Sequence, residues 1–266
     1  MKISLITVCY NAEKTIAATL ASVGRQRFDW LGTCEVEYIV IDGGSTDGTV
    51  EIVKNFADHI LDIANLSYRW LSEKDDGMYD ALNKGIRMAT GDVIGILNAD
   101  DRLDGDDVLM TVAEAFGDKD GVDCVYGDIR FVRGERTVRY YSAKRWKPWM
   151  FQWGKMPPHP GVYIRRECFE RFGLYKLGYQ IAADYELLIR FLRKNGIKAR
   201  YLDKCLVCMG LGGKSTKNWR SNLVLNREIV SGNRENGYFC CLPMLVPKYA
   251  FKIFEFILPR LGLGRH

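Results

Sequence analysis

Four short apolar runs, separated by stretches of helical pattern, constrain the fold of this chain more than any other feature. The runs are residues 3–10 (ISLITVCY), 36–42 (VEYIVID), 68–73 (YRWLSE) and 92–98 (DVIGILN). Alternation of this kind is typical of βαβ units, in which helices cover both faces of a sheet. We therefore expect an α/β fold with a mostly parallel sheet flanked by helices.

Polar and glycine-rich sequence follows each of the four predicted strands. The strand ends read CYNA (residues 9–12), DGGSTDGT (42–49), SEKDDG (72–77) and NADD (98–101). Asp, Ser and Asn are favoured at helix starts, so capping explains each end separately. Ligands of open α/β sheets bind outside the carboxyl ends of the strands, where these segments must converge. We expect a binding site there, and helix capping by the NADD carboxylates is the alternative.

The glycine-rich loop at residues 42–49 does not fit the common phosphate-binding patterns. Its glycines lack the GxGxxG spacing, and the chain contains no GxxxxGK followed by Ser or Thr. Neither a dinucleotide-dependent dehydrogenase nor a P-loop enzyme follows from it.

The sequence changes character after about residue 120. Residues 124–142 predict a hairpin that turns at Gly134, and residues 146–161 form a long loop rich in Trp and Pro. Long loops in compact domains are commonly lids or binding loops. Three loop residues fit either stacking on a sugar or pinning the loop, namely Trp146, Trp149 and Trp153.

Residues 181–194 (IAADYELLIRFLRK) predict a helix that carries a candidate general base. Asp184 shares the inward face of the helix with the apolar residues that lie three, four and seven positions later. Glu186 lies off this face and four residues before Arg190, which predicts a surface ion pair. Burial raises the pKa of a carboxyl group toward values useful for proton transfer. Asp184 is therefore the candidate base, with a helix-capping carboxylate as the alternative.

Four segments together resemble glycosyltransferase family 2, the nucleotide-sugar-dependent enzymes of GT-A fold. The segments are ITVCYNAEKTIAATLASV, YIVIDGGSTDGT, SEKDDGMYDALNKGIRMATGDVIGILNADD and IAADYELLIRF. Their order and spacing match the family over roughly residues 1–210. The resemblance implies a GT-A, Rossmann-like fold.

The resemblance also implies roles for residues at the strand ends. NADD stands at the DxD position of the family, so Asp100 is the expected ligand of a divalent cation, Mn²⁺ or Mg²⁺, and Asn98 is expected at the ribose. Asp42 stands where the family contacts the base, and Asp184 aligns with the catalytic base. The remaining expected donor-binding residues are Thr7, Tyr10, Asn11, Asp76, Asn83, Lys84 and His159.

Some of these positions also fit simpler roles. Asp75 competes with Asp76 for the nucleoside pocket, and either fits a turn residue. Lys84 and Asn83 lie on the polar side of a helix predicted over residues 78–89, where a surface lysine is common. His159 is a lone histidine of the long loop, expected at the metal or a phosphate.

The implied reaction is a single displacement. Asp184 removes the proton from an acceptor hydroxyl while that oxygen attacks the anomeric carbon and the metal-bound diphosphate leaves from the opposite face. The configuration at that carbon inverts. We expect a UDP-sugar donor and a saccharide acceptor, in the synthesis of cell-surface polysaccharide or glycan. The alternatives are a sugar-phosphate nucleotidyltransferase and a non-catalytic nucleotide- or glycan-binding subunit.

Domain boundaries follow from where the resemblance ends. Residues 1–212 are expected to form the catalytic domain, with a nucleotide-sugar half at 1–104 and an acceptor and catalytic-base half at 105–212. Residues 213–266 are expected to form a basic, amphipathic, helical C-terminal region. The excess of Lys and Arg over Asp and Glu belongs to this end of the chain, because residues 201–266 hold ten basic against four acidic side chains.

The apolar stretch at residues 238–258 indicates contact with a membrane surface. Its lysines make a transmembrane span costly, whereas an in-plane helix with a basic edge fits. Packing on protein is the alternative. A basic tail favours an anionic membrane over nucleic acid as partner. We expect a lipid-linked saccharide acceptor and a cytoplasmic protein peripheral to the membrane, and no oligomeric state follows from the sequence.

The cysteines agree with a reducing compartment. Eight are scattered through the chain, and the N-terminus has no secretory signal pattern. We expect mostly buried free thiols. The CLVC pair at 205–208 lacks the second pair of ligands that a zinc site requires.

Overall fold

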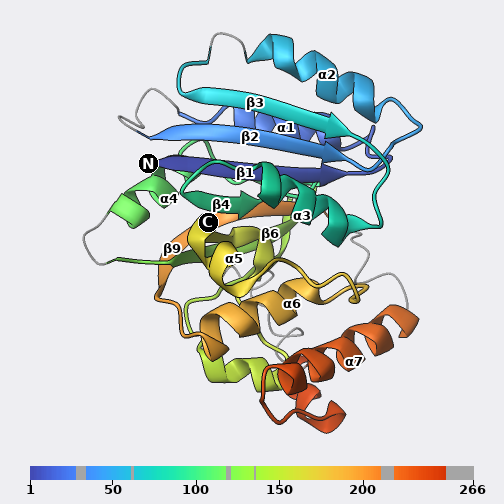
Figure 1. Ribbon diagram of the computed structural model, residues 1–266, viewed down its shortest axis with the longest axis vertical. Coiled ribbons are helices and arrows are strands. Elements are labelled where there is room, and N and C mark those ends of the chain that lie inside the picture. Colours follow the sequence, from blue (N-terminus) through green and yellow to red (C-terminus); the bar gives the residue numbers. More distant parts are fainter. Residues whose placement is uncertain (28–33, 61–62, 118–120, 135, 211–218, 250–266) are drawn as a thin grey trace.

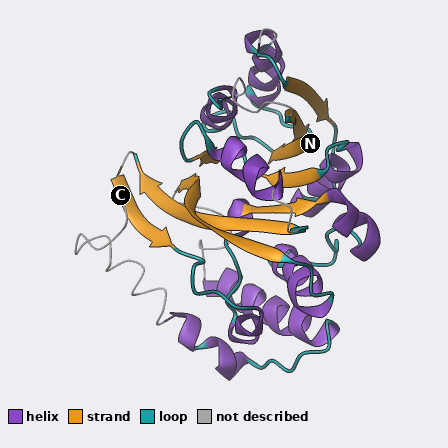
Figure 2. Cartoon of the chain, turned by 90° about the vertical axis from the view of Figure 1, so that its left-hand side faces the viewer, coloured by secondary structure: helices purple, strands orange, loops and turns teal. Residues whose placement is uncertain are grey.

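A computed structural model describes residues 1–27, 34–60, 63–117, 121–134, 136–210 and 219–249 (Figure 1). Within these ranges the chain forms one nine-stranded sheet with helices packed around it. Figure 2 shows this arrangement, with helices around a central band of strands. The predicted α/β fold is confirmed.

The N-terminal half alternates strands and helices as predicted. Its strands are β1 (Lys2–Cys9), β2 (Glu35–Asp42), β3 (Leu66–Ser72) and β4 (Val93–Ile96). Its helices are α1 (Ile16–Gly24), α2 (Thr49–His59) and α3 (Met78–Met88). The strands are parallel in the order β3-β2-β1-β4, so their carboxyl ends lie along one edge of the sheet (Figure 1). The four polar strand ends therefore belong to this edge.

The C-terminal half completes the sheet with mixed pairing. Its strands are β5 (Asp101–Leu103), β6 (Cys124–Arg133), β7 (Arg136–Tyr141), β8 (Val162–Arg165) and β9 (Ala199–Gly210). β8 is antiparallel to both β4 and β6, β7 is antiparallel to β6, and β5 is antiparallel to β9. Only β9 is parallel to its neighbour β6 among these described pairs. The predicted hairpin is present, and Gly134 at φ 61° makes its turn.

The helices of this half gather below the sheet as it is drawn in Figure 1. They are α5 (Arg166–Phe172), α6 (Ala183–Leu188), a π-helical turn η3 (Ile189–Lys194) and α7 (Trp219–Glu235). The short 3-10 turns η1 (Pro148–Trp153) and η2 (His159–Gly161) precede α5, and η5 (Leu242–Leu245) follows α7. The remaining helix, α4 (Val108–Gly117), packs on the other face of the sheet, in the same apolar cluster as α1.

Two apolar clusters cover the two faces of the sheet. Successive side chains of β1 alternate between them, with Ile6 and Val8 facing α3 and Ile3 and Leu5 facing α1. Burying each such side chain stabilises the fold by about 1.5–3 kcal/mol. Gly85 lets α3 approach β1 closely, because a Cβ atom there would stand 2.5 Å from Ile6 Cγ2.

The C-terminal region is described as far as residue 249. α7 packs against α6, and η5 packs against η1 and α7. Cys240 and Leu245 are buried in the core cluster that contains Tyr185, so residues 219–249 pack on the rest of the molecule. Most of the predicted amphipathic helix lies at 250–266, outside the described residues, and the boundary at residue 212 stays a prediction.

Two further observations bear on the setting of the protein. No helix in the described part of the chain is long and apolar enough to cross a membrane. All eight cysteines are free thiols, and six of them are buried, as expected from the sequence.

Candidate active site at the strand ends

Asp42 organises the loop that follows β2. Its side chain is fully buried, and its Oδ2 atom accepts hydrogen bonds from Gly44 N (3.1 Å), Ser45 N (3.0 Å) and Ser72 Oγ (2.7 Å). The Ser45 hydroxyl also donates to Oδ1. Burial opposes ionisation, but these hydrogen bonds outweigh it and hold the pKa of Asp42 below its usual value. The carboxylate therefore fixes the conformation of the glycine-rich loop through hydrogen bonds to Gly44 and Ser45.

The end of β1 is tied to the same loop and presents an aromatic ring. Asn11 adopts a left-handed conformation (φ 49°) and accepts a hydrogen bond from Thr46 N at Oδ1 (2.9 Å). Its own N–H donates to Ser45 Oγ (2.8 Å). The adjacent Tyr10 is 62 % exposed, which is unusual for a large aromatic side chain. An exposed ring on a fixed backbone is suited to stacking on a nucleobase.

At the end of β3, Asp75 rather than Asp76 lies against the neighbouring strand end. Asp75 Oδ2 is buried and has no hydrogen-bond partner among the described residues. A Cβ atom on Gly43 would stand 2.9 Å from it, so glycine at position 43 leaves room for this carboxylate. Burial raises the pKa of Asp75, partly offset by Lys84. Asp76 is exposed, and its N–H donates to Asp80.

The NADD segment does not cap a helix. Asp101 begins β5, and the next helix begins only at Val108, so the capping alternative is wrong. Asp100 is exposed, whereas Asp101 is fully buried. Asn98 Nδ2 donates to Asp101 Oδ2 (3.0 Å). Burial and the neighbouring Asp100 carboxylate raise the pKa of Asp101 to about 8.

The two acidic residues of NADD therefore have different surroundings. Asp101 is enclosed and orients the amide of Asn98, while Asp100, which follows the end of β4, is exposed. Within the described ranges no group of three or more His, Cys, Asp or Glu side chains is arranged to hold a metal. Mg²⁺-type sites commonly take one or two protein carboxylates and complete their coordination with substrate phosphates. A single outward carboxylate fits such a shared site.

Asp184 lies near the start of α6, half-buried beside His159 and two tyrosines. Burial raises the pKa of Asp184, and the nearby His159 opposes part of that rise. Burial in turn lowers the pKa of His159, with Asp184 acting in the opposite direction. His159 Nε2 is 2.6 Å from the hydroxyl of Tyr175, whose ring stacks on Tyr79. His159 thus lies next to the candidate base, and no described metal-ligand cluster includes it.

Tyr79 and Tyr175 are site residues that sequence reasoning missed. The Tyr79 hydroxyl donates to Ile181 O and accepts from Ala183 N (3.2 Å), so α3 is joined directly to the start of α6. α3 itself begins just after the end of β3. The apolar stripe of α3 marked Tyr79 only as a core residue, since its hydroxyl partner lies about a hundred residues away.

Two expected donor-binding residues are enclosed within the protein. Thr7 is fully buried in β1, 2.9 Å from the hydroxyl of Tyr38, because the sheet is covered on both faces at this point. Asn83 is 2 % exposed and exchanges two hydrogen bonds with the backbone of Tyr175 (2.9 and 3.0 Å). Both side chains are therefore engaged by other parts of the protein, and a contact of Thr7 or Asn83 with the donor stays a prediction.

Lys84 is engaged by acidic partners on its own side of the molecule. Its Nζ atom is 2.9 Å from Glu73 and 3.6 Å from Asp80, and it donates to Lys74 O (3.0 Å). These contacts raise the pKa of Lys84, the hydrogen bond with Glu73 being the largest contribution. A phosphate role for Lys84 would require these contacts to be exchanged, and it stays a prediction.

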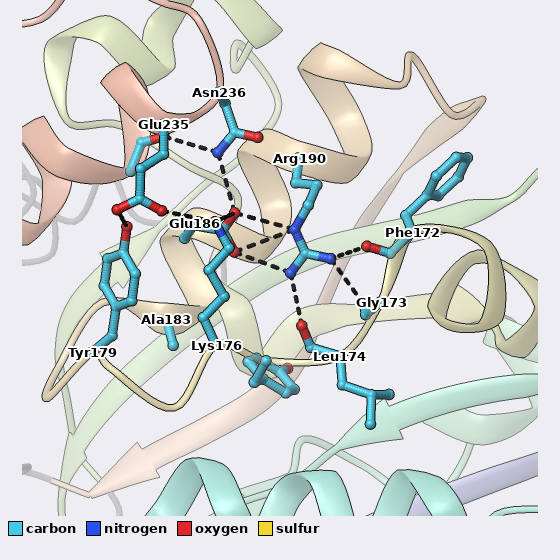
Figure 3. Close-up of polar contacts among 12 residues, drawn as sticks. Phe172, Gly173, Leu174, Lys176, Tyr179, Ala183, Glu186, Arg190, Glu235 and Asn236 are labelled. Atoms are coloured by element: carbon cyan, nitrogen blue, oxygen red, sulfur yellow. Dashed lines mark hydrogen bonds and ion pairs between the residues drawn. The ribbon is translucent and has the colours of Figure 1, made fainter.

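Glu186 is paired with Arg190 as predicted, but the pair is not at the surface. The Glu186 side chain is 0 % exposed, and Arg190 Nη2 is 3.0 Å from its Oε2 atom. Lys176 (3.1 Å) and Asn236 (3.2 Å) complete the surroundings of the carboxylate (Figure 3). Burial is outweighed by the hydrogen bonds from Arg190 and its other partners, so the pKa of Glu186 is lowered. The helix face opposite Asp184 is buried because α7 covers it.

The tryptophans of the long loop differ in exposure, which bears on the two roles predicted from the sequence, pinning the loop and stacking on a sugar. Trp146 is 7 % exposed, contacts the rings of Tyr126 and Phe151 edge-on, and donates from Nε1 to Lys155 O (3.2 Å). It pins the loop. Trp149 and Trp153 are 54 % and 40 % exposed, so their rings are available to a ligand.

Comparison with known proteins identifies a matching family and similar relatives. The family model described as Glycosyl transferase family 2 matches residues 4–178. A PGL/p-HBAD biosynthesis glycosyltransferase of Mycobacterium bovis is 33 % identical over 202 residues, covering 75 % of this chain and 73 % of that protein.

Two solved structures are similar in fold. S. aureus TarS 1-349 in complex with UDP-GlcNAc matches with a TM-score of 0.65 at 20 % identity, over 96 % of this chain and 73 % of that one. The mannosyltransferase PcManGT of Pyrobaculum calidifontis, in complex with GDP-Man and Mn²⁺, matches with a TM-score of 0.64 at 18 % identity, over 99 % and 76 %. At this level of identity they indicate the fold alone.

Proposed function

The chain belongs to glycosyltransferase family 2, and from this premise we propose that it transfers a sugar from a UDP-sugar to a saccharide hydroxyl with inversion at the anomeric carbon. The observation that carries the proposal is that three acidic groups have different surroundings. At the strand ends Asp100 is exposed, and Asp75 Oδ2 is buried with no hydrogen-bond partner among the described residues. Asp184, near the start of α6, is half-buried, and burial raises its pKa.

The nucleoside would lie between the ends of β1 and β3. The exposed ring of Tyr10 would stack on the base, since aromatic stacking tolerates any base. Asp75 would accept a hydrogen bond from a ring N–H, because its buried Oδ2 atom has no partner in the part of the chain that the structure describes. A ring N–H is present in both uracil and guanine. We propose UDP as the nucleotide of the sugar donor, and the titration described below distinguishes it from GDP.

The diphosphate end of the donor would lie at the NADD segment. Asn98, held by Asp101 at 3.0 Å, would hydrogen-bond the ribose. Asp100 would hold a divalent cation together with the donor diphosphate, and this cation would offset the negative charge of the departing nucleoside diphosphate. PcManGT was solved with Mn²⁺ and GDP-Man, which supports a cation in this fold.

Asp184 would act as the general base. A raised pKa brings a carboxylate closer to the proton affinity needed to accept a hydroxyl proton near neutral pH. The acceptor oxygen then attacks the anomeric carbon as the diphosphate leaves from the opposite face, so no covalent sugar–enzyme intermediate forms. Trp149 and Trp153 would contact the acceptor, because both rings are exposed on the loop ahead of α6.

We assign the acceptor to a lipid-linked saccharide and the protein to the cytoplasmic face of a membrane. Phe239, Leu242 and Val246 are 70 %, 51 % and 65 % exposed and lie in or next to η5. A groove of about 550 Å³ beside them is lined by apolar side chains, two arginines (Arg227 and Arg234), Ser231 and Glu235. Apolar anchors next to basic side chains suit an anionic bilayer surface.

Calorimetric titration of UDP, GDP and dTDP, each with and without Mn²⁺, tests the donor site in the wild type and in Asp100→Ala. We expect UDP to bind with Mn²⁺ and the Mn²⁺ dependence to vanish in the variant, which should fold normally because Asp100 is exposed. Tight binding of GDP or dTDP instead would reassign the donor. Equal binding of UDP with and without Mn²⁺ would refute the role of Asp100.

A further inference from the structure

Glu228 of α7 holds the backbone that leads into the helix of the candidate base. Its carboxylate accepts hydrogen bonds from three successive backbone N–H groups, those of Gln180 (2.7 Å, to Oε1), Ile181 (2.9 Å, to Oε2) and Ala182 (2.8 Å, to Oε2). Asp184 follows two residues later. No residue of the family match at 4–178 supplies these contacts, because Glu228 lies 50 residues beyond its end.

These hydrogen bonds provide acceptors for backbone N–H groups at and just before the start of α6. The first N–H groups of a helix have no partner within it, and no side chain at the N-cap of α6, Ala182, satisfies them. Glu228 accepts from Ala182 N, and the Tyr79 hydroxyl accepts from Ala183 N. The other two N–H groups that Glu228 binds belong to the two residues before the N-cap. Hydrogen bonds from N–H groups to an ionised carboxylate are about twice as strong as those between neutral groups. Glu228 therefore fixes the conformation of residues 180–182 from outside the segment.

A second anchor holds the same segment from the opposite direction. The Tyr79 hydroxyl donates to Ile181 O and accepts from Ala183 N (3.2 Å). The segment that precedes Asp184 is thus held between α3, which follows a strand end of the donor site, and α7. Few backbone torsions remain free to alter the direction of the Asp184 side chain.

The end of α7 and the residue after it make further contacts with α6 and with the segment that precedes it. Glu235 pairs with Lys176 (2.7 Å) and accepts from the Tyr179 hydroxyl (2.8 Å). Asn236 donates to the buried Glu186 (3.2 Å). Figure 3 shows these side chains directed toward one another across α6 and α7. The contacts fix α6 against α7 as one unit.

We propose that Glu228 is a positioning residue for glycosyl transfer, which makes α7 part of the catalytic unit. Its carboxylate fixes the backbone ahead of Asp184 so that the base is aimed at the acceptor hydroxyl. The inference rests on the proposed role of Asp184. Misplacing a reacting group by about 1 Å costs about 100-fold in rate, so loss of this brace reduces kcat and leaves donor binding intact.

The electrostatic surroundings of Asp184 provide a readout that a purely structural brace would not affect. The charged and titratable groups that face it are His159 from η2, Tyr79 from α3, Tyr175 from the loop before α6 and Glu228 from α7. The charge of Glu228 contributes to the raised pKa of Asp184, after burial and the other contacts. Removing that charge moves the acidic limb of the kcat profile to lower pH.

The test compares Glu228→Gln, Glu228→Asp and the wild type. Release of nucleoside diphosphate is measured from UDP-glucose, UDP-GlcNAc, GDP-mannose and dTDP-glucose, with octyl β-glucoside or water as acceptor. For Glu228→Gln we expect kcat to fall about 100-fold, KM for the donor to stay within about twofold, and the acidic limb to move to lower pH. Glu228→Asp keeps the charge on a shorter side chain, so kcat falls and the acidic limb stays in place.

Asp104→Asn is the matched control for lost stability. Asp104 is a partly buried carboxylate paired with Arg130 (2.6 Å) on β6, away from α7. We expect it to lower the melting temperature while kcat and the pH profile stay as in the wild type. If Glu228→Gln does not fold, Glu228→Asp and amide hydrogen exchange at residues 180–182 carry the test.

The outcomes separate this inference from the proposed function. Wild-type kcat and wild-type amide protection in the Glu228 variants, with Asp184→Asn inactive, would overturn the positioning role alone. Full activity of Asp184→Asn would overturn the assignment of the base, and the positioning role with it. Loss of donor affinity in the Glu228 variants would also overturn the inference, because a brace of the base does not touch the nucleotide.

Discussion

Gly43 lies directly against the carboxylate of Asp75, since a Cβ atom at position 43 would stand 2.9 Å from Asp75 Oδ2. The glycine-rich loop after β2 therefore does more than turn the chain. It leaves space for the Asp75 carboxylate from the next strand end, and one buried oxygen of that carboxylate has no hydrogen-bond partner among the residues that the structure describes. An unpaired buried acceptor is costly unless a ligand supplies a donor.

Gly43→Ala should weaken nucleotide binding with little loss of stability. The added methyl group meets only the mobile end of the Asp75 side chain, which can rotate away. We expect the Kd for UDP to rise about 10-fold, the equivalent of about 1.4 kcal/mol, and the melting temperature to change little. Calorimetric titration measures the first and thermal denaturation the second.

The control for Gly43→Ala is the double variant with Asp75→Asn. If both changes act through the same carboxylate, the double variant binds UDP no more weakly than the worse single variant. Additive losses would show that Gly43 acts on the nucleotide by another route.

Asp184→Asn should abolish transfer while making the protein no less stable at neutral pH. Loss of a general base reduces kcat by about 100- to 10,000-fold, and donor affinity should stay unchanged. Asparagine keeps the shape of the side chain and removes a partly buried charge. Single-turnover assays and calorimetric titration of the donor check these two expectations, and full activity would refute the base assignment.

The pH dependence of stability follows from the direction of the Asp184 pKa shift. The pKa is raised in the folded state above the unfolded value of about 3.9. The folded state therefore binds more protons than the unfolded state between these two values, and the contribution of Asp184 to stability is lost as pH rises through them. Denaturant titrations from pH 4 to 8 should show a shallower decline for Asp184→Asn, while an unchanged slope would contradict the shift.

The positions of the strand ends could be predicted from the sequence because the carboxyl ends of parallel strands lie at one edge of a sheet. Once the apolar runs are placed, the segments carrying Tyr10, Asn98 and Asp100 must lie at one edge of the sheet. The burial of Thr7 was missed for the same reason that its strand was recognised. A strand buried on both faces shows no alternation, so position within it does not separate a residue at the mouth from one in the core.

Glu186 shows a different limit of sequence reasoning. Its spacing from Arg190 is a local signal, and the pair exists. Whether the pair is exposed depends on α7 and on Lys176 and Asn236, which only the folded chain brings to it. Glu228 escaped notice likewise, because its partners are backbone N–H groups that leave no mark on the sequence.

Glu186→Gln should destabilise the protein far more than the equivalent change in an exposed pair. Removing one partner of a buried ion pair costs about 3–5 kcal/mol, because the remaining charge loses its compensation. Glu170 forms the same i,i+4 pair with Arg166 at the surface, with side chains 56 % and 39 % exposed. Glu170→Gln should cost at most about 1 kcal/mol. Similar free energies of unfolding for the two variants would contradict the buried network.

The membrane-facing surface is best tested by substitution, because truncation after residue 237 would also remove the buried Cys240 and Leu245. The triple variant Phe239→Ser, Leu242→Ser, Val246→Ser changes only side chains that are more than half exposed, so the fold should persist. Each of these side chains contributes about 1.5–3 kcal/mol when buried in an apolar phase. We therefore expect binding to vesicles of phosphatidylglycerol and phosphatidylcholine to weaken at least about 10-fold.

Leu177→Ser is the control for that variant, because Leu177 is 59 % exposed and lies outside the surface formed by residues 239–246. It should sediment with vesicles as the wild type does. Retention of the triple variant on the vesicles would exclude this surface as the membrane contact. Weaker binding of every protein to pure phosphatidylcholine vesicles would show that the anionic lipid contributes to the contact. The variant with Arg227→Gln and Arg234→Gln should then lose the preference for the anionic lipid while nucleotide binding persists, and that loss would identify these two arginines as the basic side of the contact.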